Sequence, residues 1–311
     1  MPDEKRKSRK PPARVEAILA RNAATAVIFR RGPSRKVRML KWNLRTDKIE
    51  GGQWIDARVH VERSDISPNG ELVACFVASY RRAPQTWTTI SRPPYFTALT
   101  VWPKGDTYGG GGLFVSDSHF LLGHDERIQY GVDEFKLLPD FTLPKRFRVQ
   151  DFMRHCPAPQ CDVEQARMVL SGWRFTQRRG PGRSQANADM EYLLEAPEIM
   201  TRPLDDPKHP RFDLHRIVEG YGSGRRQTNF RIMRAEIADL ETKECRDLGY
   251  IDWVDADHNG DVLWSARGQL FRLAGPNKRT MTLDAAPKLV ADLNDMTFEA
   301  VEPPRRALKW P

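Results

Sequence analysis

A short phrase occurs twice in this chain, at residues 65–73 and at residues 255–263, 190 residues apart. Both copies begin with Asp and carry an oxygen-bearing side chain two residues later. Asn-Gly, an acidic residue and apolar residues then follow. An internal repeat constrains the architecture of a lone sequence strongly, because it marks structural units of one kind. The phrase therefore predicts a chain built from repeated units.

The phrase is typical of a tight turn that leads into a β-strand. Asn and Gly tolerate positive φ, and Pro68 fixes φ in the first copy. Residues 72–78 then form a nearly continuous apolar run, which indicates a strand buried on both faces. After the second copy, residues 262–265 and 269–273 predict a β-hairpin. Each copy therefore predicts an inner strand of a layered β structure.

Residues 65–74 match at every position the phrase D-x-S-P-[DN]-G-x-x-[VIL]-A. In this the chain resembles β-propeller repeat proteins, in particular blades of the TolB-like and WD types, where the phrase opens an inner strand. The second copy departs from it, with Asp257 in place of Ser and His258 in place of Pro. The resemblance implies an all-β propeller fold and no particular activity, because one fold serves many functions.

The spacing of the two copies predicts a blade count. A four-stranded blade takes roughly 40–50 residues, so 190 residues correspond to about four blades. One β-rich unit, residues 24–42, precedes the first copy, and the second copy opens another. We expect a single β-propeller over residues 21–311, most simply of six blades, with five or seven as alternatives and a pair of β-sandwiches as the competing architecture. Helical patterns are confined to residues 162–168 and 235–242.

The two ends of the chain differ in character. Residues 1–14 carry six basic and two acidic side chains without apolar periodicity, and we expect residues 1–20 to be a disordered basic tail. Residues 287–293 and 296–301 predict two short strands. One would complete the last blade and the other would join the first, which closes the ring and removes sheet edges.

The sequence has no secretion signal and no apolar run long enough to span a membrane. Its four cysteines do not form a disulfide framework, and Cys75 lies in a predicted buried strand. We therefore expect a cytoplasmic chain that is monomeric as a folded unit.

Two segments raise the question of a bound metal. Cys156 and Cys161 have a spacing acceptable for zinc, but the second pair of ligands is missing nearby. The turn at residues 255–261 resembles the start of a calcium loop, yet Ala266 stands where an EF-hand needs Glu. Turn formation explains these acidic residues without an ion. The sequence therefore predicts no metal and no cofactor, and leaves calcium at this turn as an open alternative.

Catalytic motifs are missing from the sequence. There is no G-x-S-x-G elbow, no P-loop and no H-E-x-x-H. We therefore predict no catalytic residue. The first functional hypothesis is a non-catalytic scaffold that binds a protein partner, and a hydrolytic enzyme with its site in the central channel is an alternative.

Arginine-rich loops are the strongest candidates for binding. Arg178, Arg179 and Arg183 lie on one Gly-bearing and Pro-bearing loop, and Arg225 and Arg226 lie on another. Loops of successive blades converge on one face of a propeller, and the chain has a formal net charge of +9. Such a surface attracts acidic proteins, nucleic acid or anionic membranes. Solvated loop tips without a ligand are the alternative interpretation.

Overall fold

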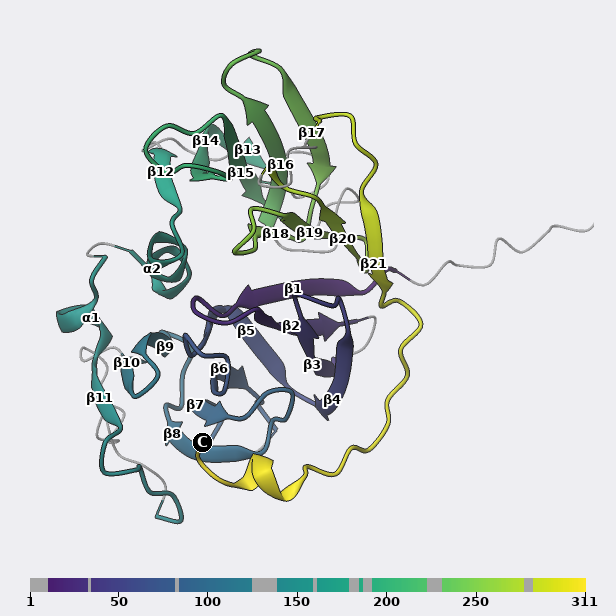
Figure 1. The fold of residues 1–311 in the computed structure, drawn as a ribbon. Helices are drawn as coiled ribbons and strands as arrows, with labels where there is room; N and C mark the ends of the chain where they lie inside the picture. Colours follow the sequence, from purple (N-terminus) through teal and green to yellow (C-terminus); the bar gives the residue numbers. More distant parts are fainter. Residues whose placement is uncertain are drawn as a thin grey trace, which may run out of the picture.

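The computed structural model describes residues 11–32, 35–81, 84–124, 139–158, 161–178, 185–186, 192–222, 231–276 and 282–311. These residues are nearly all β. They form five small sheets of mainly antiparallel strands, with two α-helices (Figure 1). The all-β prediction is confirmed.

The first two sheets are four-stranded meanders, in which each strand pairs with the next along the chain. The strands of the first are β1 (Arg14–Leu19), β2 (Thr25–Arg31), β3 (Val37–Asn43) and β4 (Ile49–Ile55). Those of the second are β5 (Arg58–Ile66), β6 (Val73–Ala78), β7 (Thr86–Ser91) and β8 (Ala98–Pro103). All six residues of β6 are buried, as the apolar run predicts.

The third sheet contains the strands β9 (Gly109–Ser116), β10 (His119–His124) and β11 (Arg148–Asp151). The last of these runs parallel to β10, which requires a long connection. Two helices follow, α1 (Phe152–His155) and α2 (Val163–Leu170). Asp162 and Gln165 form a capping box at the start of α2, which explains why the predicted helical turn forms there.

The fourth sheet has the longest strands, and the fifth is again a four-stranded meander. The fourth contains β12 (Arg174–Gln177), β13 (Gln185–Ala186), β14 (Tyr192–Pro203), β15 (Phe212–Tyr221), β16 (Arg231–Asp239) and β17 (Cys245–Tyr250). The fifth contains β18 (Trp253–Ala256), β19 (Val262–Ala266), β20 (Gln269–Leu273) and β21 (Lys288–Asp292). A short 3-10 helix, η2 (Arg305–Leu308), lies near the C-terminus.

Apolar clusters join each sheet to its neighbour, and α2 fills the space between the third and fourth sheets. Representative pairs are Ile18 and Val73 between the first and second sheets, Trp102 and Phe120 between the second and third, Met200 and Trp264 between the fourth and fifth, and Leu263 and Trp42 between the fifth and first. The contacts therefore run through the sheets in chain order and return from the last sheet to the first.

The described residues form five sheets, where the spacing predicts six blades most simply and five or seven as alternatives. The two copies of the repeated phrase lie in the second and fifth sheets. The 190 residues between them therefore cover three intervals from one sheet to the next, whereas the spacing predicts four blades. Each interval contains more residues than a standard four-stranded blade, because α1, α2 and the twelve-residue strand β14 lie between the copies.

Three predictions need correction. Residues 14–19, expected in the disordered tail of residues 1–20, form β1, whose alternate residues pack into the core. Residues 235–242, expected as a helical turn, mostly belong to β16, because pairing with β15 and β17 overrides local propensity. Residues 296–301 form no strand, whereas the strand predicted within 287–293 is confirmed as β21.

Among the described residues, no helix has the length and apolar character needed to cross a membrane.

Candidate functional site

The third residue of each repeated phrase organises its own turn. Ser67 Oγ lies 2.7 Å from Asn69 Oδ1 and accepts a hydrogen bond from Leu72 N at 3.0 Å. In the second copy, Asp257 Oδ1 accepts hydrogen bonds from Asn259 N at 2.8 Å and from Asp261 N at 3.1 Å. These side chains satisfy backbone donors that a tight turn leaves open. The predicted turn followed by a strand is present in both copies.

The first residue of each phrase connects neighbouring sheets. Asp65 is fully buried, and its Oδ2 accepts hydrogen bonds from Phe114 N of the third sheet and from Arg21 of the first, at 2.8 and 3.4 Å. Asp255 Oδ1 accepts from Trp173 Nε1 at 3.0 Å and from Arg202 Nη1 at 2.5 Å, both from the fourth-sheet region. The repeat thus links sheets as well as shaping turns.

The acidic turn that resembles a calcium loop is bound by an arginine. Arg272 Nη1 lies 2.7 Å from Asp257 Oδ2 and 2.8 Å from Asp261 Oδ2, and its Nη2 lies 2.9 Å from Asp47 Oδ1. Burial alone would raise the pKa of Asp47, but hydrogen bonds from Lys288 and Arg272 hold it below its usual value. The guanidinium therefore supplies the positive charge that these carboxylates need.

Turns from four sheets lie in a row on one face of the molecule. The β1–β2 turn is central, because Asn22 N donates to Pro68 O at 2.8 Å and Arg21 O accepts from His258 Nε2 at 2.7 Å. On the far side of the second-sheet turn, Asn69 N donates at 2.8 Å to Oδ1 of Asp117, which lies in the β9–β10 turn of the third sheet. The repeated phrases thereby fix the relative positions of the loops on this face.

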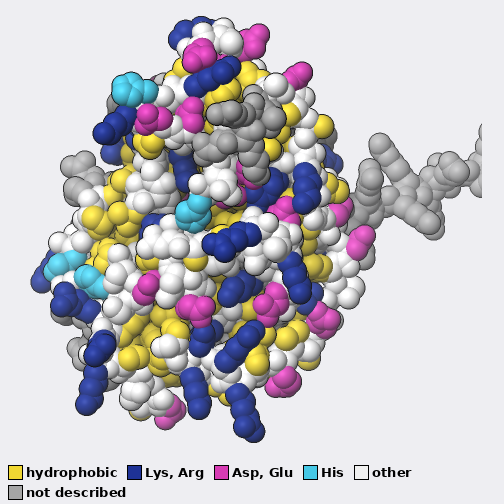
Figure 2. Space-filling model, viewed as in Figure 1, with side chains coloured by type: hydrophobic (Ala, Val, Ile, Leu, Met, Phe, Trp, Pro, Cys, Tyr) yellow, Lys and Arg dark blue, Asp and Glu magenta, His cyan; other side chains and the backbone are white. Residues whose placement is uncertain are grey.

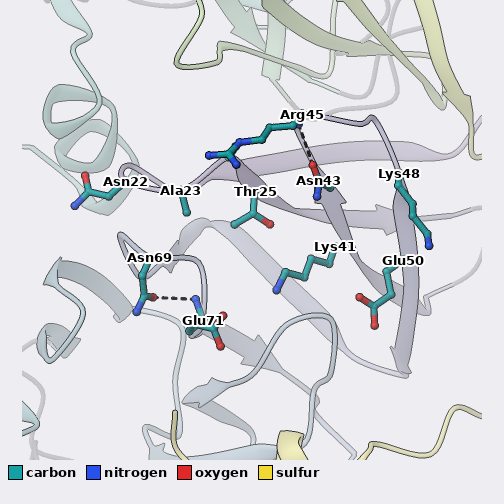
Figure 3. Close-up of a pocket in the computed structure, with 11 residues that line it drawn as sticks. Asn22, Ala23, Thr25, Lys41, Asn43, Arg45, Lys48, Glu50, Asn69 and Glu71 are labelled. Atoms are coloured by element: carbon teal, nitrogen blue, oxygen red, sulfur yellow. Dashed lines mark hydrogen bonds between the residues drawn. The ribbon is translucent and has the colours of Figure 1, made fainter.

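A cleft of about 630 Å³ opens on this face between the first two sheets (Figure 3). It is lined by Asn22, Ala23, Ala24, Thr25, Lys41, Asn43, Arg45, Lys48, Glu50, Asn69 and Glu71. The β3–β4 hairpin supplies most of the charged groups, and the β5–β6 turn forms the opposite side. We call this cavity the cationic cleft.

Its basic and acidic side chains differ in how they are paired. Within the described part of the chain, Lys41, Arg45 and Lys48 form no ion pair, whereas Glu71 pairs with Arg92 and Glu50 lies 3.6 Å from Arg306. Figure 2 shows basic side chains, with acidic ones among them, over the part of this face formed by the first two sheets. The cleft therefore presents a net positive charge to a ligand.

Amide side chains add hydrogen-bond donors to the cleft. Asn43 Oδ1 accepts from Arg45 N and Thr46 N, and Asn69 Oδ1 accepts from Glu71 N, so each oxygen is engaged in its own turn. The NH₂ groups of both amides have no partner among the described residues. Donors and positive charges together favour a ligand rich in acceptor oxygens.

A second set of charged groups lies in the interior, where β5, α2 and the fourth sheet approach. Burial alone would raise the pKa of Glu62, but a hydrogen bond from His60 and the charge of Arg231 lower it to about 2. The pKa of Glu164 is also held below its usual value by Arg231 and Arg216, against the effect of burial. Burial raises the pKa of Glu198.

This interior contains carboxylates with shifted pKa values, which is the feature expected of a channel enzyme. The two lowered carboxylates are paired, however: Glu62 Oε1 lies 2.9 Å from His60 Nδ1, and Glu164 contacts both Arg216 and Arg231. Carboxylates matched in this way stay ionised and hold neighbouring elements together. Their arrangement explains structure more directly than catalysis.

Of the five arginines predicted to bind a ligand, the structure describes one. Arg178 is exposed at the end of β12, and its guanidinium carbon lies 4.2 Å from the centroid of the Phe175 ring. It does not line the cationic cleft. Arg179, Arg183, Arg225 and Arg226 lie outside the described residues.

The basic residues of the cleft are not among the residues that the sequence predicts to bind a ligand. Lys41 lies in the β-rich unit predicted at residues 24–42, and Arg45 and Lys48 follow it closely, but the three are not adjacent in sequence as the arginines of the loops are. Only the packing of the hairpin against residues 69–71 makes them a site.

The other sequence candidates add no site. Cys75 is buried, and burial raises the pKa of its thiol to about 12. Cys156 and Cys161 are free thiols, and burial raises the pKa of each. Within the described ranges, no group of three or more His, Cys, Asp and Glu side chains is arranged to hold a metal ion.

No protein-family model matches this chain, and no curated protein matches it. Among solved structures, it is similar to an acylaminoacyl peptidase in complex with Z-Gly-Gly-Phe-chloromethyl ketone, with 11% identity, 91% of this chain and 53% of that chain covered, and a TM-score of 0.35. It is also similar to Kuenenia stuttgartiensis hydrazine synthase, at 9% identity and a TM-score of 0.30. This match covers 91% of this chain and 84% of that chain. An uncharacterised protein from Listeria monocytogenes EGD-e is 8% identical, with a TM-score of 0.23. This match covers 85% of this chain and 62% of that chain. This chain spans about half the length of the peptidase.

Proposed function

We propose that this chain is a non-catalytic scaffold that binds an acidic segment of a partner protein in the cationic cleft. One observation carries the proposal: Lys41, Arg45 and Lys48 face the cleft without an acidic partner in the described chain, while both acids of the cleft are paired. Unpaired cations in a concave site raise the local concentration of an anionic ligand.

A peptide fits this cleft better than nucleic acid does. None of the described lining residues is Phe, Tyr or Trp, so the cleft offers no platform on which a base could stack. Asn43 and Asn69 provide amide donors suited to backbone carbonyl and carboxylate oxygens.

For the fold, we propose that the five sheets are the blades of a single β-propeller. The support is the contact between the last and first sheets. Ser265 Oγ donates to Val15 O at 2.5 Å, and Leu263 belongs to the same buried apolar cluster as Trp42. A closed ring of this kind leaves no unprotected inner edge and holds surface loops rigidly. Rigid loops suit a binding scaffold because little conformational entropy is lost on binding.

A hydrolytic site in the interior is the second candidate. The raised pKa of Glu198 favours it, since a general acid must be protonated near neutral pH. Gln165 Nε2 donates to Glu198 Oε2 at 3.3 Å. The nearby free thiol of Cys161 has its pKa raised by burial, which disfavours the nucleophilic thiolate. The cationic cleft therefore has the stronger support.

The test is binding of a fluorescent oligoglutamate peptide, measured by anisotropy at low and at physiological salt. The double variant Lys41→Ala, Arg45→Ala should weaken binding roughly thirtyfold, since two exposed ion pairs contribute about 1 kcal/mol each. The matched control is Lys145→Ala, Arg146→Ala, which removes the same charge from an exposed segment between β10 and β11.

Equal weakening by both double variants would show that only the overall charge matters and would contradict the proposal. Tighter binding of a single-stranded oligonucleotide than of the peptide would support nucleic-acid binding instead. In both cases the affinity should fall as salt rises, because exposed charges are screened within about 8 Å at physiological ionic strength.

A further inference from the structure

A second, smaller cavity of about 230 Å³ adjoins the cationic cleft. The two share four lining residues, namely Asn22, Ala23, Ala24 and Arg45. The rest of the second cavity comes from Leu44 and from the repeated turn of the fifth sheet, residues 257–259. The two cavities thus meet at the β1–β2 turn and at Arg45.

We propose that the two cavities form one continuous groove that binds an extended peptide, with acidic side chains in the cationic cleft and neutral backbone in the second cavity. The inference rests on the proposed function and names the shape of its ligand. Arg45 is exposed, has no acidic partner among the described residues, and lines both cavities. A peptide that extends from one cavity into the other therefore contacts Arg45 in both cavities.

The second cavity differs from the first in its chemistry. Its one acid, Asp257, is 4% exposed and is already paired with Arg272 at 2.7 Å. Leu44 adds an apolar surface. The cavity adds no unpaired cation beyond Arg45 within the described residues, so a second acidic side chain has little to bind there.

His258 supplies a group suited to a peptide backbone. Its Nε2 lies 2.7 Å from Arg21 O, and because a carbonyl oxygen only accepts, Nε2 carries the proton. In the neutral ring Nδ1 is then an acceptor, and it has no partner among the described residues. A backbone N–H is the donor that a peptide always offers.

The occupant that fits both cavities is an acidic stretch followed or preceded by neutral residues. The larger cavity alone has the volume of a typical small-ligand site. The smaller one extends it toward the fifth sheet, past the turn held by Asn22 and His258. A single anion would fill only the first cavity.

The test compares a short oligoglutamate with two longer peptides, which extend the same glutamates with alanine and serine at the amino or the carboxyl end. At least one longer peptide should bind the unaltered protein about fivefold more tightly than the short one, through one additional hydrogen bond and apolar contact. This comparison needs no variant and is therefore independent of folding defects.

Variants then show which residues give the longer peptide its higher affinity. His258→Ala should make the affinities for the short and the longer peptides equal, and Arg45→Ala should weaken the binding of short and long peptides alike. His258→Gln is the conservative control, because its amide can still donate to Arg21 O. Equal affinity for short and long peptides would overturn the inference while leaving the proposed function intact. Failure of every peptide to bind would overturn the proposed function itself.

Discussion

Asp65 and Asp255 open the two copies of the repeat, and each accepts hydrogen bonds from a neighbouring sheet. Asp257 and Asp261 then bind Arg272, which also reaches Asp47 of the first sheet. These residues were expected to form turns, and they do, but their second role is to connect sheets. At the scale of single residues, the repeat therefore explains why the surface turns hold fixed positions.

We predict that calcium does not stabilise the protein. The Arg272 side chain is 10% exposed and its guanidinium already binds both Asp257 and Asp261, so a calcium ion would have to displace it to reach these carboxylates. Millimolar calcium should leave the melting temperature unchanged, whereas Arg272→Ala should cost about 3 kcal/mol, because it leaves buried carboxylates uncompensated. A calcium-dependent rise in the melting temperature of the unaltered protein would contradict this.

Glu62 predicts a specific dependence of stability on pH. Its pKa in the folded protein is about 2, below the ordinary 4.5, so its ionised form stabilises the fold above that ordinary value. This stabilisation, about 2 kcal/mol for a partly exposed group, is lost as the pH falls from 4.5 toward 2. Urea unfolding should show the difference between the natural protein and Glu62→Gln shrinking across this window. A difference that stays constant there would rule out the pairing.

At the scale of elements, the glycine run of β9 allows the third sheet to approach the second closely. A Cβ atom on Gly111 would lie 1.9 Å from the carbonyl oxygen of Arg63 on β5, and the φ angle of Gly111 is +77°. Residues 109–112 are four consecutive glycines, and glycine inside a strand is typical of a close approach of another backbone. Packing of β5 against β9 therefore depends on the missing side chain.

We predict that Gly111→Ala costs at least about 4 kcal/mol of unfolding free energy, since the clash is with backbone that cannot rotate away. Gly105→Ala is the matched control, because φ there is +95° but nothing lies within 4 Å of the added Cβ. It should cost only about 1 kcal/mol, from backbone strain alone. Equal unfolding midpoints in urea for the two variants would show that the close approach is unimportant.

What the sequence predicted correctly was local. The turns at Asn69-Gly70 and Asn259-Gly260, the strands after them and the helix after Asp162 depend on neighbouring residues, whose chemistry is readable in order. The partners of Asp65 were not predictable, because Arg21 and Phe114 are distant in sequence. The cationic cleft was missed for the same reason: it exists only where one sheet's hairpin meets the next sheet's turn.

At the scale of the whole molecule, the C-terminal region joins parts that lie far apart in sequence. β21 completes the fifth sheet, and residues 294–311, here called the C-terminal strap, then run past β4 and end beside β8 (Figure 1). Gln53 Nε2 donates to Val301 O at 3.1 Å, and the rings of Phe147 and Trp310 lie 4.8 Å apart. The strap therefore contacts the first and third sheets.

The last prediction concerns removal of the chain ends. Deleting residues 287–311 should unfold the protein, because it removes β21, the strap, and the carbonyl of Leu293 that accepts a hydrogen bond from the buried Arg30 at 2.9 Å. Deleting residues 1–10 leaves every described strand intact, since β1 begins at Arg14, and should leave stability nearly unchanged. Circular dichroism melts of the two truncated proteins provide the measurement. Equal melting temperatures would mean that the last sheet and the strap are not needed to hold the five sheets together, and that the first four sheets fold without the closing contact.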